Sequence, residues 1–387
     1  MASHEVDMSN SNPNRQPLQQ PSLPWRMTSS VVMGLTAALC RTFLYGLNSV
    51  EVTGLERFLE VLDQRKDVEK RQRGLITVSN HISVLDDPMV WGVLPFSYAF
   101  NPSNHRWGLG AHDICYKNKL LASFFYAGQV LPTHRLKHSH HGGLFQPTMQ
   151  QAIRLLSSPP PPTITTTPEP TSSEGSQDIS DPFSSGGMTF STTGTDRYVS
   201  PSIYARNRHS WVHVFPEACV HQHPRMLMRY FKWGISRLIL ESEPMPDVLP
   251  MFIDGPQRVM PEDRRFPRFL PRFPVRFRVA FGELLDAERT FGDLRARWQE
   301  LVRKERKRTA KALAMGELTD ELKYGREAVD LRIEVARRVR EEVAKVRRSM
   351  GYPDEEPGFE LAETWAREPN KDRFKSGVDD SLVNKRE

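Results

Sequence analysis

Cysteine is scarce in this sequence. The 387 residues include only three cysteines, Cys40, Cys115 and Cys219, which lie far apart along the chain. None of them has the C-x-x-C spacing that is typical of zinc sites and redox dithiols, and three cysteines cannot supply a disulfide framework. The fold therefore depends on an ordinary apolar core, for which the chain is long enough.

Long apolar runs are also lacking. A transmembrane helix needs about 18–20 predominantly apolar residues, and the best candidate stretch is interrupted by Arg41. Residues 25–48 are nevertheless apolar or small, and they include Trp25, Phe43 and Tyr45, aromatic residues of the kind that lie at headgroup depth. We predict a helix that lies in the membrane interface. The alternative is an ordinary first helix packed on the core.

Charge of one sign does not dominate. The chain has 53 basic and 47 acidic residues, which gives a net charge of +6. This balance suits the surface of an anionic membrane but does not by itself identify a partner. Because the basic residues alternate with acidic ones and have no aromatic stacking platform, we expect no nucleic-acid partner.

Composition separates a main domain, at 25–294, from less regular segments. Residues 1–24 are rich in Ser, Asn, Gln and Pro, resemble neither a secretory signal nor a transit peptide, and are expected to be disordered. Residues 157–202 open with prolines and continue in Ser, Thr and Gly, which predicts a disordered low-complexity insertion in a surface loop. Residues 295–350 form a charged helical region, packed on the domain or extending from it, and 351–387 form a tail.

Five short apolar stretches predict strands, with helical patterns between them. Such an order indicates an α/β fold with a mixed sheet flanked by helices. The predicted strands are residues 75–78, 129–131, 211–215, 248–253 and 275–281.

Polar side chains follow the first of these strands, in the segment Asn80-His81-Ile82-Ser83-Val84-Leu85-Asp86-Asp87-Pro88. A carboxylate held against one nitrogen of a histidine allows the other nitrogen to accept a proton. We therefore predict His81 as a general base and Asp86 as its orienting partner, although the spacing alone is weak evidence. Ser83 is either a nucleophile or a helix-capping hydroxyl, and Asp87 with Pro88 favours a helix start.

A second polar segment, Phe215-Pro216-Glu217-Ala218, follows a later strand. Glu217 there either contacts a substrate hydroxyl or headgroup, or caps the following helix. Between the two segments, Arg135 follows another strand and could bind a lipid phosphate in a bidentate contact. The alternative for Arg135 is a surface residue.

The order of these segments resembles the glycerophospholipid acyltransferases, a family with an HX4D motif. The resemblance rests on Asn80 to Asp86, Gly128 to Arg135, Phe215 to Ala218, and Val248 to Asp254. It implies an acyltransferase domain over residues 25–294, with His81 and Asp86 as catalytic residues. It further implies that the substrate-binding residues are Asn80, Ser83, Arg135, Phe215, Pro216, Glu217 and Ala218. The sequence departs from the family in one respect, because Ala218 stands where the family has glycine.

Within the family, the likeness is strongest to the mitochondrial phospholipid–lysophospholipid transacylases. It implies acyl transfer from a phospholipid to a lysophospholipid without CoA, as in the conversion of monolysocardiolipin to cardiolipin. It also implies no metal and no cofactor, attachment to the surface of mitochondrial membranes facing the intermembrane space, and a homo-oligomer or larger membrane complex. Two alternatives stay open at this point: an acyl-CoA-dependent lysophospholipid acyltransferase, and a membrane scaffold without catalytic activity.

Overall fold

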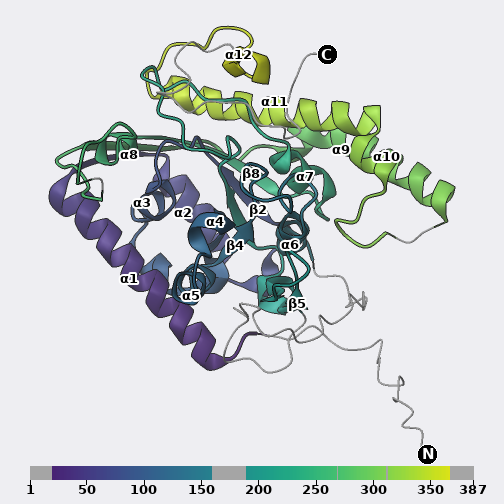
Figure 1. Ribbon diagram of the computed structural model, residues 1–387, viewed down its shortest axis with the longest axis horizontal. Helices are drawn as coiled ribbons and strands as arrows, with labels where there is room; N and C mark the ends of the chain where they lie inside the picture. Colours follow the sequence, from purple (N-terminus) through teal and green to yellow (C-terminus); the bar gives the residue numbers. More distant parts are fainter. Residues whose placement is uncertain (1–19, 159–188, 268, 311–312, 367–387) are drawn as a thin grey trace, which may run out of the picture.

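The computed structural model describes residues 20–158, 189–267, 269–310 and 313–366 (Figure 1). A seven-stranded sheet in the order β1-β9-β8-β2-β7-β3-β4 forms its centre. Strand β8 pairs with β9 in the antiparallel sense, whereas the other pairs of this sheet are parallel. The strands are β1 (Ser49–Thr53), β2 (Leu75–Val78), β3 (Arg106–Ala111), β4 (Val130–Thr133), β7 (Trp211–Val214), β8 (Asp247–Asp254) and β9 (Arg276–Phe281).

Helices cover both faces of the sheet, so the fold is the mixed α/β architecture that the sequence predicted (Figure 1). Helices α1, α2, α3 and α5 lie on one side, and α6, α7, α9 and α11 on the other. The helices are α1 (Leu23–Leu47), α2 (Leu55–Gln64), α3 (Asp86–Trp91), α4 (His112–Cys115), α5 (Lys119–Ala127), α6 (Pro147–Leu156), α7 (Gly234–Glu241), α8 (Pro256–Val259), α9 (Ala287–Thr309), α10 (Asp320–Tyr324), α11 (Arg326–Ser349) and α12 (Ala362–Ala366).

All five predicted strands are present, and the prediction missed two strands of the seven-stranded sheet. Strand β1 lies at the edge of the sheet, and only Val50 and Val52 of its five residues are apolar, which gives a short signal. Strand β3 contains Gly108 and Gly110, residues that weaken the strand signal in a sequence. The central strands β2 and β8 are buried almost throughout, which explains why their apolar runs were easy to recognise.

Helix α1 packs along the domain with one face and leaves the other face open. Its inner face approaches the short 3-10 helix η2 (Phe96–Phe100) so closely that a Cβ atom on Gly34 would lie 2.5 Å from Cε1 of Phe100. The Ser29 hydroxyl donates a hydrogen bond of 2.6 Å to the carbonyl of Ala127, and the Arg41 guanidinium donates to the carbonyls of residues 92–94. Among the described residues, α1 is the helix that is long and apolar enough to cross a membrane.

The predicted disordered insertion is too long at its carboxyl end. Residues 159–188 lie outside the described residues, but Thr189–Phe190 (β5) and Tyr198–Val199 (β6) form a two-stranded antiparallel sheet. Both residues of β6 are buried, since they pack against the domain. The predicted disordered amino terminus likewise lies largely outside the described residues, up to residue 19.

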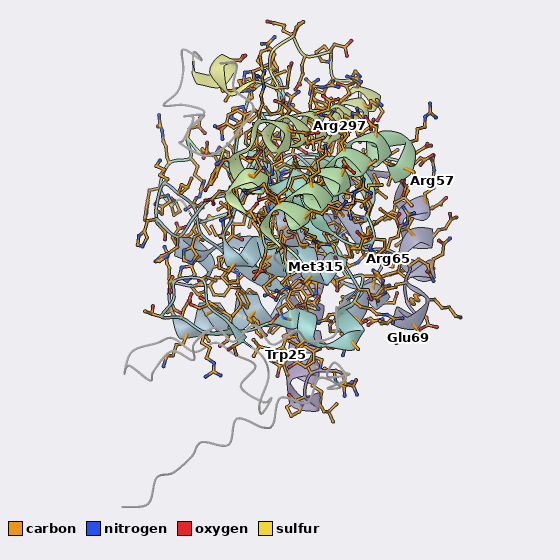
Figure 2. All side chains as sticks on the ribbon, turned by 90° about the vertical axis from the view of Figure 1, so that its right-hand side faces the viewer. Trp25, Arg57, Arg65, Glu69, Arg297 and Met315 are labelled. Carbon is orange, nitrogen blue, oxygen red and sulfur yellow. The ribbon has the colours of Figure 1, made fainter. Side chains whose placement is uncertain are left out.

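The charged region at 295–350 contains the long helix α11, which packs on β8 and α7. Its apolar residues Leu331, Val335, Val339 and Val343 are fully buried. Figure 2 shows Arg297 of α9 near the top of the molecule and Trp25 of α1 near the bottom. Helices α9 and α11 therefore lie on the side of the domain opposite α1. Of the predicted tail, residues 351–366 are described, and α12 buries Trp365.

Candidate active site

The polar residues that follow β2 and β7 meet at one edge of the sheet. Strands β2, β7 and β8 are neighbours and run parallel, so their carboxyl ends lie side by side. His81 follows β2 and Glu217 follows β7. The carboxyl edge of a parallel sheet is the usual place for a binding site in α/β proteins.

His81 and Asp86 are in direct contact. Nδ1 of His81 lies 2.9 Å from Oδ2 of Asp86, within hydrogen-bond distance. The chain leaves β2 in a turn and enters α3 at Asp86, which brings the two side chains together although they are not neighbours on a helix face. This contact makes Nδ1 of His81 the donor nitrogen and leaves Nε2 as the nitrogen that can accept a proton.

The surroundings of Asp86 fix the carboxylate in place. Its side chain is fully buried, and Oδ2 also accepts hydrogen bonds from the backbone N–H groups of Ile82 (2.6 Å) and Ser83 (2.9 Å). The two backbone N–H groups therefore fix the orientation in which Oδ2 of Asp86 faces Nδ1 of His81.

The ring of His81 packs against another ring on one face and is partly exposed to solvent. It stacks on the ring of Phe215 with a centroid distance of 4.5 Å, and its side chain is 22% exposed. Within the described part of the chain, Nε2 of His81 makes no hydrogen bond. The backbone on both sides is also fixed, because the His81 carbonyl accepts a hydrogen bond of 2.8 Å from the N–H of His221.

Glu217 joins the two segments through backbone contacts. Oε1 accepts the N–H of His81 and Oε2 accepts the N–H of Arg229, each at 2.8 Å. The side chain is buried, and burial raises the pKa of Glu217 to about 7, while the two backbone hydrogen bonds lower it. Both oxygens accept a backbone N–H group, so the side chain joins the turn after β2 to the loop after β7.

Known proteins are similar to this chain over most of its length. A sequence model of the acyltransferase family matches residues 49–254, a range that contains both segments. Tafazzin from Saccharomyces cerevisiae is 37% identical to this chain over 363 residues, which cover 92% of this chain and 85% of the yeast protein. The chain belongs to the tafazzin family of acyltransferases.

Two further proteins share less sequence with this chain. Tafazzin from Drosophila melanogaster is 29% identical over 63% of this chain and 48% of its own length. The solved structure of the 1-acyl-sn-glycerophosphate acyltransferase PlsC from Thermotoga maritima is 14% identical to this chain. The match covers 75% of this chain and 83% of PlsC, with a TM-score of 0.37.

Ala218 adopts the backbone conformation for which glycine is suited. Its φ is +53°, in the left-handed region that costs a residue with a Cβ atom about 1 kcal/mol. The side chain is exposed, so its methyl group meets no steric barrier beyond its own backbone. The departure noted in the sequence is therefore a modest local strain next to Glu217, and the hydrogen bonds of Glu217 are intact.

Asn80 and Ser83 have their polar groups engaged inside the protein. The Asn80 amide accepts the N–H of Ile253 at 2.8 Å and donates to the carbonyl of the same residue at 2.9 Å, which ties β2 to the end of β8. The Ser83 hydroxyl is buried and accepts the N–H of Leu85 at 3.3 Å, just before α3. Both residues thus shape the turn that carries His81.

Arg135 follows β4, which lies three strands away from β2 in the sheet, or about 14 Å between strand axes. Its guanidinium forms a bidentate ion pair with Asp113, and about a third of each side chain is exposed. The structure therefore places Arg135 apart from His81, on the same carboxyl edge of the sheet.

One group of residues near Arg135 has the composition of a metal site. The ligand atoms of His112, His134 and Asp196 all lie within 4.8 Å of one another. These atoms already have hydrogen-bond partners, since Tyr198 contacts His112 and Thr192 contacts both His134 and Asp196. Hydrogen bonding inside the protein accounts for this group without an ion.

Sequence reasoning missed two supports of the site. Asp87, next to Asp86, forms a bidentate ion pair with Arg106 of β3. Burial raises the pKa of the Asp87 carboxyl, but the Arg106 guanidinium outweighs this effect, so that the pKa lies below its usual value. His213 of β7 is buried beneath Phe215 and bonds to Thr77 at 2.8 Å, and burial lowers its pKa to about 3. The feature of the sequence that could have revealed these two contacts was a polar residue inside a strand, Arg106 in β3 and His213 in β7.

Proposed function

We propose that this protein is a CoA-independent transacylase that moves a fatty acyl chain from a phospholipid to a lysophospholipid, as in the remodelling of monolysocardiolipin to cardiolipin. The observation that carries the proposal is the 2.9 Å contact between His81 and a buried Asp86, with Nε2 of His81 left to accept a proton. Membership of the tafazzin family and the resemblance to the transacylase branch support the choice of lipid donor.

The proposed reaction proceeds in two proton transfers. Nε2 of His81 takes the proton from the hydroxyl of the lysophospholipid, and the oxygen attacks the ester carbonyl of the donor phospholipid. The tetrahedral intermediate then collapses, the donor ester bond breaks, and the imidazolium returns its proton to the leaving oxygen. Asp86 holds the tautomer of His81 and stabilises the imidazolium between the two steps.

Four further residues are assigned supporting roles in this reaction. Asn80 and Glu217 are fully engaged with backbone groups, so we assign them to positioning His81 and not to substrate contact. Phe215 fixes the plane of the imidazole ring by stacking. Arg135 remains a candidate for a lipid phosphate at the far end of the same edge, where a phosphate would compete with Asp113.

Three variants test the catalytic assignment with radiolabelled phospholipid and a lysophospholipid in vesicles. His81→Ala and Asp86→Asn should each lower the rate by about 10²–10⁴-fold, the usual contribution of a positioned acid or base. Ser83→Ala should keep most of the activity because the hydroxyl is buried in a turn. A folded Ser83→Ala variant without activity would instead indicate an acyl-enzyme on that serine.

The same assay separates the two acyl donors. The transacylase proposal predicts product without acyl-CoA, with the label transferred from the phospholipid. Product that forms with acyl-CoA alone would establish the acyl-CoA-dependent reaction in its place. A scaffold without catalysis predicts no product under either condition.

We also propose that the protein lies on the membrane surface through α1 and the loop between α8 and β9. On α1, apolar side chains at every fourth position face outward, up to 74% exposed at Leu39. In the loop, Phe266 and Phe269 are exposed, and Phe273 contacts Phe43 of α1, so that loop and helix form one surface. The outward row of α1 consists of Leu23, Met27, Val31, Leu35 and Leu39.

This surface fits an anionic lipid bilayer. Exposed basic residues Arg265 and Arg272 flank the aromatic residues of the loop, which suits negatively charged headgroups. Val84, in the catalytic turn between His81 and Asp86, is itself 64% exposed. With the family resemblance, these features support a monotopic protein of mitochondrial membranes, facing the intermembrane space.

A further inference from the structure

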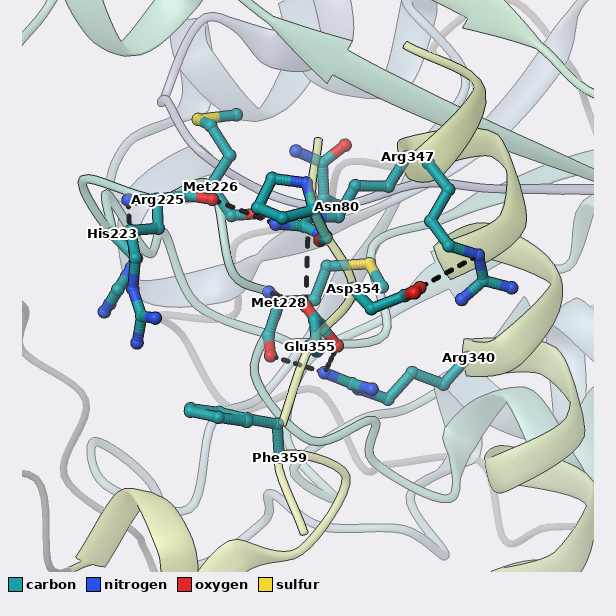
Figure 3. A network of polar contacts seen from close by, with 12 residues as sticks. Asn80, His223, Arg225, Met226, Met228, Arg340, Arg347, Asp354, Glu355 and Phe359 are labelled. Atoms are coloured by element: carbon teal, nitrogen blue, oxygen red, sulfur yellow. Dashed lines mark hydrogen bonds and ion pairs between the residues drawn. The ribbon is translucent and has the colours of Figure 1, made fainter. Parts of the chain in front are cut away.

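Helix α11 buries three arginines, and two of them, Arg340 and Arg347, have no part in the proposed reaction. The side chains of Arg340 and Arg347 are 7% and 1% exposed, and burying a guanidinium is costly unless every donor is bound. Both lie on the face of α11 that is turned toward the loop between β7 and α7, the loop that begins with Phe215 to Ala218 (Figure 3).

The two guanidiniums bind the backbone of this loop. Arg347 donates to the carbonyls of Met226 (2.8 Å) and Arg225 (3.0 Å), and Arg340 donates to those of Met228 (2.8 Å) and Arg229 (3.0 Å). Four loop carbonyls are therefore held from one helix.

Glu355 completes the arrangement from the segment after α11. One oxygen lies 2.5 Å from Arg340, and the other accepts the N–H of Met228 at 3.0 Å (Figure 3). The carboxylate thus neutralises a buried guanidinium and binds the loop directly.

The loop depends on such external contacts. Met226 has a φ of +53°, and Ala218 at the start of the loop has the same value. Each left-handed residue with a side chain costs about 1 kcal/mol and persists where the surroundings determine its conformation. Of these two strained residues, Met226 is the one that Arg347 holds, through hydrogen bonds to the carbonyls of residues 225 and 226.

One peptide group connects Arg340 to the catalytic turn. The carbonyl of Met228 accepts from Arg340, and the N–H of the same peptide group, on Arg229, donates to Oε2 of Glu217 at 2.8 Å. The other oxygen of Glu217 accepts the N–H of His81 at 2.8 Å. A positive charge at the carbonyl end of a peptide strengthens the hydrogen bond that its N–H group donates.

We propose that Arg340 is a positioning residue for the active site: through the peptide group at 228–229 and Glu217, it fixes the backbone of His81. The inference rests on the proposed function, in which His81 is the general base. It assigns a role to α11, which lies outside the segment that the acyltransferase family model matches.

The test compares Arg340→Met with Arg337→Met. Arg337 lies on the same helix, is half exposed and pairs with Glu334, so its loss should leave kcat unchanged. Arg340→Met should lower kcat about 10- to 100-fold with little change in KM, because a misplacement of about 1 Å costs that much. In a double-mutant cycle, Arg340→Met should lower kcat no further when Glu217→Gln is already present. The reason is that both residues act on His81 through the same chain of hydrogen bonds.

Hydrogen exchange gives a readout that is independent of activity. The N–H of His81 should exchange faster in Arg340→Met than in the wild type or Arg337→Met. If Arg340→Met does not fold, Arg340→Lys serves in its place, because an ammonium cannot bind both carbonyls and Glu355 with the same geometry. Several-fold loss of kcat is expected for that variant.

Two results would overturn the proposal. One is a folded Arg340 variant with kcat within about twofold of the wild type and unchanged exchange at His81. The other is a cycle in which the losses from Arg340→Met and Glu217→Gln multiply. An inactive wild type that nevertheless shows the exchange effect would refute the proposed function and leave the positioning contact intact.

Discussion

Helices α1 and α11 lie on opposite sides of the sheet (Figure 1). Each has an unusual distribution of side chains, and the two distributions are opposite. Helix α1 exposes a row of large apolar residues to its surroundings. Helix α11 does the reverse, since it buries Arg332, Arg340 and Arg347 against the domain. Buried charges and exposed apolar rows are the two patterns that require an explanation in a folded protein.

The two departures have different physical causes. Arg340 and Arg347 of α11 have partners inside the molecule, because their donors meet backbone carbonyls and Glu355. The apolar row of α1 is exposed and has no such partner among the described residues. We propose that the lipid of a membrane covers it. In our proposals, α11 positions the active site from inside the protein and α1 contacts the lipid surface.

The largest expected effect is on the α11 side. Arg347→Met removes donors from the carbonyls of residues 225, 226 and 353 and should lower the free energy of unfolding by about 3 kcal/mol or more. Arg337→Met, on the exposed face, should change it by less than about 0.5 kcal/mol. Urea denaturation of both variants measures the difference. Equal stabilities would mean that the buried arginine is dispensable.

The pH dependence of Glu217 gives the next effect. Burial raises its pKa to about 7 from an ordinary 4.5, so the native state keeps a proton that the unfolded state has released between these values. The contribution of this group to stability therefore falls as pH rises through that window, by about 3 kcal/mol as an order of magnitude. Relative to Glu217→Gln, which does not titrate, the wild type should lose stability between pH 5 and pH 8. A constant difference would contradict the raised pKa.

On the α1 side, the expected effect appears in membrane binding and not in stability. Leu35→Ser combined with Leu39→Ser removes two exposed side chains from the proposed lipid contact and should weaken partition into anionic vesicles by about 2 kcal/mol, roughly 30-fold. The free energy of unfolding in solution should hardly change. Tyr324→Ser, an exposed site on α10, is the control for vesicle binding. Unchanged sedimentation of the double variant with vesicles would remove α1 from the contact.

The smallest effect concerns the strained residue at the start of the loop that α11 holds. Ala218→Gly should raise the free energy of unfolding by up to about 1 kcal/mol, because glycine adopts a φ of +53° without strain. Activity should change little, since the hydrogen bonds of Glu217 are already formed. Thermal unfolding and the vesicle assay measure the two quantities. A large gain of activity would show that the alanine distorts the site.

The sequence predicted those parts of the site that depend on neighbours in the chain. His81 and Asp86 lie in one short turn, so their contact followed from the motif and from the strand before it. The burial of β2, β7 and β8 followed from their apolar runs in the same way.

The remaining contacts depend on distant segments. The partners of Glu217 were not predictable from its own strand, because Oε1 meets a backbone group 136 positions earlier in the chain. Arg340 and Arg229 are 111 positions apart, and a charged helix gives no sign of which arginines will be buried. Contacts of buried polar groups with backbone carbonyls leave no pattern in the sequence, unlike the periodicity of apolar residues.

Strand β1 directly follows α1, and its partner in the sheet is β9. The hydrogen bond between Asn48 and Val275 closes a loop of 227 positions. During synthesis, which proceeds at about 5–20 residues per second, the edge strand therefore waits many seconds for its partner to leave the ribosome. Throughout that interval, Phe43 of α1 lacks its partners Phe273 and Phe277, so the nascent chain exposes more apolar surface than the folded protein does.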